Sequence, residues 1–142
     1  MNRSSLTWSF TRGPARTFSD FGDPVSGSTS YALCLYDDRE LKVAAWVEPS
    51  ASLWTATRTA YRYRDPWGSN DGFQRAVLRA GAAGRSSIKV SLGGALAQLP
   101  KAIVDQALWG AREAVVVQLH QSDGACYESP FAPNNVRRLS ER

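Results

Sequence analysis

Side chains able to bind a ligand are densest in residues 61–73, which read YRYRDPWGSNDGF. Aromatic faces stack on sugar rings and on nucleic-acid bases, and arginine is suited to planar, bidentate contacts. Trp67 is the strongest candidate, because it stands between a proline and a glycine in an expected loop, where burial is not implied. The candidate ligand-binding residues of this stretch are Trp67, Tyr61, Tyr63 and Arg64.

The two tyrosines also fit a purely structural interpretation. Tyr61 and Tyr63 alternate with Arg62 and Arg64, and successive side chains of a strand point to opposite faces of a sheet. The alternation favours this second interpretation, in which both tyrosines face the core and both arginines face solvent.

Three side chains of the same stretch carry oxygen atoms that could bind Ca²⁺, namely Asp65, Asn70 and Asp71. The EF-hand pattern is not present, since counting from Asp65 puts Trp67 third and Ala76 twelfth, where oxygen ligands are required. Asp and Asn side chains also bond their own backbone in tight turns, which the Asp-Pro and Asn-Asp-Gly sequences favour. We therefore expect no metal and no cofactor, with Ca²⁺ as the alternative.

Residue types suited to catalysis are few. His120 is the single histidine, Cys34 and Cys126 are the only cysteines, and no Gly-x-Ser-x-Gly sequence is present. A zinc site needs three or four such ligands, and a catalytic triad needs a nucleophile and a base held together. The sequence predicts that the protein is not an enzyme and has no catalytic residues, and a hydrolase is the weaker alternative.

The elements that must position these residues are short. Segments of strand length, either apolar or alternating, occupy 6–10, 31–36, 41–47, 53–57, 59–64, 73–78, 87–92, 114–119 and 125–131. Turn residues separate them, and Asp123-Gly124 is the strongest hairpin signal. Residues 100–110 begin with proline, end with glycine and have apolar residues at helical spacing. We predict an all-β antiparallel β-sandwich (jelly-roll or Ig-like) of about nine short strands, with one short helix near 101–109.

The chain of 142 residues is long enough to bury its own core as one domain. We expect a single sandwich domain over 1–133 and a polar C-terminal tail over 134–142. The residues predicted to be buried are Leu6, Trp8, Phe10, Leu33, Leu35, Val43, Trp54, Val77, Leu78, Ile88, Val90, Val115, Val117 and Leu119.

Charge and hydropathy narrow the range of partners. The 17 Lys and Arg exceed the 13 Asp and Glu, and the net charge is +4 at pH 7. The basic residues are scattered along the chain, whereas a nucleic-acid footprint should be clustered, so nucleic acid is not expected. No apolar run approaches the ~18 residues of a membrane span, so membrane insertion is not expected. The expected partner is an unknown protein or polysaccharide.

Three longer stretches resemble a known kind of domain: FGDPVSGSTSYALCLYD, YRYRDPWGSNDGFQRAVLRAGAAGRSSIKV and VVVQLHQSDGACYESPF. They are similar to an exported β-domain of large secreted proteins from deltaproteobacteria and environmental bacteria. Its pattern runs Phe-Gly-Asp-Pro, Tyr-x-Leu-Cys-x-Tyr-Asp, Ala-Gly-x-x-Gly and Ser-Asp-Gly-x-Cys, and the likeness covers residues 8–131 in order. The resemblance implies export and a β fold, and it implies no activity.

The resemblance also implies a disulfide between Cys34 and Cys126. Relatives carry a second cysteine pair before a tryptophan, and both members are absent from residues 49–54 here, which leaves these two as partners. The alternative is two small thiols in a cytoplasmic protein, which the lack of an apolar signal sequence at the start favours. The predicted location is therefore secreted or cell surface, and cytoplasmic if the cysteines are free.

These observations favour a non-catalytic exported module with a structural, adhesive or binding role. The alternative is a carbohydrate- or protein-binding accessory domain with an aromatic site near Trp67.

Overall fold

The structure is a computed structural model that describes residues 5–37, 40–93 and 115–131. The helix expected near 101–109 and the tail expected over 134–142 lie outside these residues, as do the two ends of the expected 1–133 domain. Within them 58% of the residues are in strands and 4% are helical, and the predicted all-β antiparallel sandwich is confirmed.

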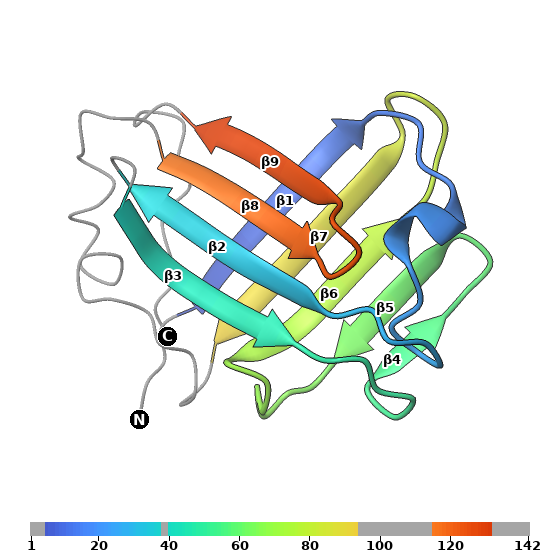
Figure 1. Cartoon of the computed structure of the whole chain (residues 1–142), viewed down its shortest axis with the longest axis horizontal. Coiled ribbons are helices and arrows are strands. Elements are labelled where there is room, and N and C mark those ends of the chain that lie inside the picture. The colour runs from blue at the N-terminus through green and yellow to red at the C-terminus, as the bar shows by residue number, and fades with distance from the viewer. Residues whose placement is uncertain (1–4, 38–39, 94–114, 132–142) are drawn as a thin grey trace.

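Two antiparallel sheets form the sandwich (Figure 1). The five-stranded sheet has the order β1-β7-β6-β5-β4, and the four-stranded sheet has the order β3-β2-β8-β9. Strands of the two sheets cross one another in this view. The strands are β1 (Ser5–Gly13), β2 (Tyr31–Asp37), β3 (Glu40–Val47), β4 (Trp54–Ala56), β5 (Ala60–Arg64), β6 (Phe73–Arg79), β7 (Ser86–Gly93), β8 (Val115–Gln121) and β9 (Cys126–Phe131).

The core lies between the sheets and is built by alternation along each strand. In β3, for example, Val43, Ala45 and Val47 are buried while Ala44 and Trp46 are exposed. Alternate residues face the same side of a sheet, so the apolar members of each strand meet those of the facing sheet. Of the residues predicted to be buried, the following are: Leu6, Trp8, Leu33, Leu35, Val43, Trp54, Leu78, Ile88, Val90, Val117 and Leu119.

Two core predictions were wrong. Val77 is only half-buried because it neighbours Leu78 in β6, and consecutive strand residues cannot both face the core. Phe10 is half-buried where the pairing of β1 with β7 becomes irregular, between Phe10 and Gly13. The side chain of Val115 lies outside the described part of the chain.

Aromatic rings link the two sheets and fix the position of β5. The Tyr31 ring of β2 packs against Trp54 of β4 with centroids 5.4 Å apart, and Trp54 packs against Tyr63 of β5 at 5.1 Å. Tyr63 in turn meets the edge of Phe73 at 6.4 Å. Tilted and edge-on pairs of this kind add to the free energy gained by burial alone. Trp54 and Phe73 thus hold the Tyr63 ring from two sides.

A short 3-10 helix, η1 (Phe18–Phe21), was not expected from the sequence. Thr17 and Asp20 form a capping box, in which the Thr17 amide donates to the Asp20 carboxylate at 2.7 Å and the Asp20 amide donates to the Thr17 hydroxyl at 3.3 Å. The spacing of these two residues was the available signal. Among the described residues, no helix is long and apolar enough to cross a bilayer.

The core position of Leu33 yields a stability prediction. Leu33 is 0% exposed in the centre of β2, so Leu33→Ala should lower the free energy of unfolding by about 2–5 kcal/mol through lost burial and a residual cavity. Leu41→Ala, on the same sheet but 49% exposed, is the matched control and should change it by less than about 0.5 kcal/mol. Urea denaturation monitored by tryptophan fluorescence measures both, and equal losses would contradict the burial assignment.

Candidate functional site

The loop between β5 and β6, residues 65–72, is organised by one buried carboxylate. Asp65 is only 3% exposed, and its oxygens accept hydrogen bonds from the Tyr63 hydroxyl at 3.2 Å and the Trp67 amide at 3.2 Å. The Ser69 amide donates at 2.8 Å, and the Ser69 hydroxyl donates to the same carboxylate. Four donors therefore converge on one side chain, which satisfies the requirement that a buried charge be hydrogen-bonded.

These contacts determine how Asp65 ionises. Burial raises its pKa, but the hydrogen bonds from Ser69, Tyr63 and Trp67 outweigh burial and leave the pKa below its ordinary value. For Tyr63, burial dominates and raises the pKa to about 12. At neutral pH the pair is therefore a tyrosine hydroxyl donating to a carboxylate.

Further hydrogen bonds fasten the loop at its far end. The Asn70 amide group donates to the Tyr63 hydroxyl at 2.9 Å, and the Trp46 backbone amide donates to the Asp71 carboxylate at 3.0 Å. Gly68 has φ +63, and a Cβ there would lie 2.9 Å from the Gly93 carbonyl oxygen, so the turn requires glycine. The Gly93 amide at the end of β7 donates to the Gly72 carbonyl at 2.8 Å. The loop is thus tied to the core, to β3 and to β7.

The three residues considered as calcium ligands serve these three separate contacts. Asp65 accepts from its own loop, Asn70 donates to a core tyrosine, and Asp71 accepts from the backbone of β3. Across residues 5–37, 40–93 and 115–131, no group of three or more His, Cys, Asp and Glu is arranged to hold a metal ion.

Trp67 stands at the outside of this fixed loop and is 85% exposed. A large aromatic side chain in water forgoes the burial that stabilises Trp8 and Trp54 in the core. Its backbone is nevertheless held in place by Asp65. The arrangement is a rigid support that presents an indole ring to solvent.

A shallow groove lies beside this loop, on the outer face of the five-stranded sheet. It crosses β4, β5 and β6, and its volume is about 460 Å³, within the range of small-ligand sites. We call it the arginine groove. Its lining residues are Ser52, Leu53, Thr55, Arg62, Tyr63, Arg64, Pro66, Arg75, Ala76 and Val77. Trp67 is not one of these lining residues, but it follows the lining residue Pro66 directly in the chain.

Three arginines come together there. Arg64 of β5 lies directly opposite Arg75 of β6, and Arg62 lies one alternation further along β5. All three are exposed, and no acidic residue is among the described residues that line the groove. In the part of the chain that the structure describes, the one salt bridge joins Lys42 to Glu40, so these arginines have no carboxylate partner there.

This cluster was missed by the sequence analysis, which found the basic residues scattered. The signal was the alternation itself, because YRYR in β5 and the Arg75 position in β6 both predict an outward guanidinium. Only the register of β5 against β6 brings Arg64 and Arg75 face to face.

The aromatic platform considered for Tyr61 and Tyr63 does not form. Tyr61 is 5% exposed and stacks on Phe18 with centroids 4.2 Å apart, and Tyr63 is 1% exposed. The inward direction favoured by the alternation is therefore confirmed. Trp67 and Arg64 remain as the surface members of the four candidates.

The predicted disulfide between Cys34 and Cys126 was wrong, since both cysteines are free. Cys34 is on β2 and Cys126 is on β9, and β8 lies between these strands (Figure 1). Two interstrand spacings separate them by about 10 Å, beyond the ~7 Å Cα separation that a disulfide spans. Burial raises the pKa of both thiols, which keeps them in the less reactive protonated form.

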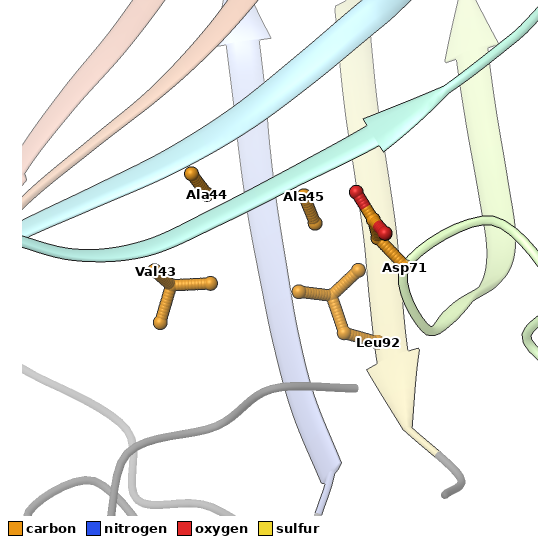
Figure 2. A pocket seen from close by; sticks show the side chains of 5 residues that line it. All are labelled: Val43, Ala44, Ala45, Asp71 and Leu92. Atoms are coloured by element: carbon orange, nitrogen blue, oxygen red, sulfur yellow. The ribbon is translucent and has the colours of Figure 1, made fainter. Parts of the chain in front are cut away.

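A second hollow, shown in Figure 2, lies at the edge of β3 and has a volume of about 50 Å³. Its lining residues are Val43, Ala44, Ala45, Asp71 and Leu92. This volume suits a few water molecules at most and is far below that of a ligand site.

Comparison with known proteins adds no relative. No family model matches the chain, and neither curated proteins nor solved structures gave a match. The resemblance to the exported β-domain therefore stays a prediction.

The lowered pKa of Asp65 predicts a pH-dependent loss of stability. The unfolded pKa is near 3.9, so the ionised carboxylate stabilises the fold fully above that pH, and this contribution is lost as pH falls through the lower folded value. Asp65→Asn should be less stable than the parent protein at pH 6, and the difference should narrow towards pH 3. Urea unfolding at several pH values measures this. Glu48→Gln, at an exposed position, is the control, and a pH-independent difference for Asp65→Asn would contradict the assignment.

The opposed arginines predict an unfavourable coupling. Like charges directly opposite in a sheet destabilise it, so the pair Arg64 and Arg75 should lower the free energy of unfolding by about 0.2–1 kcal/mol. A double-mutant cycle with Arg64→Gln, Arg75→Gln and the double variant isolates this coupling. The coupling should shrink between 20 mM and 500 mM NaCl, because salt screens exposed charges. A favourable coupling would contradict the interpretation.

Proposed function

We propose that the protein is a non-catalytic binding module that holds a linear polysaccharide along the arginine groove, with Trp67 stacked on a sugar ring at the end of the groove. The observation that carries the proposal is the 85% exposed indole on a loop that is fixed by the buried Asp65. Preorganised aromatic side chains bind with little loss of conformational entropy, which is why they dominate many recognition sites.

The groove supports a chain-like ligand better than a compact one. It crosses three strands, and three guanidinium groups share its lining with hydroxyl and apolar side chains. Arginine donates to several oxygens at once, and sugars present hydroxyl oxygens in series. A groove of this kind binds by many weak contacts in line, and the ligand needs no enclosed pocket.

The proposed location is outside the cell. The free cysteines remove the disulfide as an argument for export, so this location rests on the resemblance alone. Fractionation of the producing organism tests it, and recovery of the protein from the cytosol would instead agree with the free thiols.

Replacement of Trp67 tests the proposed function. On a glycan array and in affinity gel electrophoresis with soluble polysaccharides, Trp67→Ala should weaken binding by at least about tenfold, in line with a recognition hot spot. Its melting temperature should stay within about 2 °C of the parent value, because the ring is exposed and buries little surface.

The matched control is Trp46→Ala, which removes a tryptophan that is 55% exposed on the other sheet and should leave binding unchanged. The proposal is wrong if the parent protein retains no polysaccharide, or if both variants bind equally well.

A further inference from the structure

We infer that the arginine groove selects polysaccharides whose sugars carry carboxylate groups, such as uronic acids, over neutral ones. This inference rests on the proposed function and names the ligand class of the same site. It starts from the cluster of Arg62, Arg64 and Arg75, which the described residues leave without a carboxylate partner.

The placement of Arg64 and Arg75 indicates a role in binding, because it does not stabilise the fold. Arg64 and Arg75 are cross-strand neighbours, and like charges so placed oppose the pairing of β5 with β6. Elsewhere in the described sheets, Lys42 is paired with Glu40 at 3.2 Å. A like-charge pair that works against folding is the kind of local conflict expected at a functional site, and two cations suit an anionic ligand.

The geometry of the cluster suits a row of anions. Arg62 and Arg64 are two residues apart on one strand, which separates them by about 6–7 Å, and Arg75 stands about 5 Å across from Arg64. Guanidinium groups bind carboxylates through two parallel hydrogen bonds, and these are stronger than bonds to neutral hydroxyls. Lys89 of β7 lies opposite Val77 on the same outer face and extends the positive charge beyond β6.

The same observations favour a polysaccharide over a nucleic acid. Proteins that bind single strands supply several aromatic faces for successive bases. Tyr63 is the one aromatic residue among those that line the arginine groove and it is buried, so the exposed ring nearest in the chain is Trp67 of the adjoining loop. One stacking position with a row of cations matches a polymer that carries one charge on each ring.

The test compares four polymers by affinity gel electrophoresis and isothermal titration calorimetry at 50 mM NaCl. Polygalacturonate carries carboxylates, galactan is its neutral counterpart, dextran sulfate carries sulfates, and oligo-dT represents nucleic acid. Polygalacturonate should bind at least about tenfold more tightly than each of the others, and its affinity should fall as NaCl is raised to 300 mM.

Two double variants assign the effect to the groove. Arg64→Gln with Arg75→Gln should weaken polygalacturonate binding by at least about tenfold. Arg12→Gln with Arg85→Gln removes the same charge from exposed positions at the β1 and β7 side of the sheet and should change binding by less than about twofold. Arg64→Lys with Arg75→Lys keeps the charge without the planar fork and should restore only part of the affinity. Circular dichroism melts verify that each variant is folded.

The outcomes separate this inference from the proposed function. Galactan binding as tightly as polygalacturonate, with a Trp67 requirement, overturns the carboxylate selection and leaves the proposed function standing. Tighter binding of dextran sulfate or oligo-dT also overturns the selection. Equal losses for the groove and control pairs show a general charge effect and overturn it too. Failure to bind any of the polysaccharides overturns both.

Discussion

The buried carboxylate of Asp65 is the interaction on which the surface site depends. Its oxygens accept hydrogen bonds from Tyr63, which belongs to the core, and from Trp67 and Ser69, which belong to the loop. A charge this deeply buried is tolerated only with several such donors, so the loop has little freedom to adopt another shape. The position of an exposed indole is in this way determined by packing that begins between the sheets.

Strand β5 contributes alternate residues to the core and to the surface. In β5 the inward residues Tyr61 and Tyr63 are stabilised by aromatic contacts, and the outward Arg64 lies opposite Arg75 of β6. The unfavourable charge contact is carried by a strand whose other face is strongly anchored. Proteins commonly accept such a local loss of stability where a surface is used for binding.

Much of the fold could be predicted because apolar and polar residues alternate along short stretches of the chain. The strand segments around Leu33, Val43 and Val117 were all recognisable from apolar residues at every second position. The order of strands within a sheet is not local, and this is why Cys34 and Cys126 were wrongly paired: nothing near either residue indicates that β8 separates β2 from β9.

The candidate site was likewise predictable only where it depends on local sequence. The exposure of Trp67 followed from its proline and glycine neighbours, and the inward tyrosines followed from alternation. The arginine cluster and the role of Asp65 depended on how β5 meets β6 and on how a loop folds back on Tyr63, and short stretches of sequence do not specify either.

The hydrogen bond from the Trp46 amide to the Asp71 carboxylate affects the outer edge of the four-stranded sheet. Among the described strands β3 lies at the edge of its sheet, and the outward amide groups of an edge strand form a template on which another chain could add as a strand. The Asp71 carboxylate already occupies one of these amides and places a negative charge on that edge, so an incoming strand would have to displace it. The loop that carries Trp67 thus also hinders the addition of a strand at this point of β3.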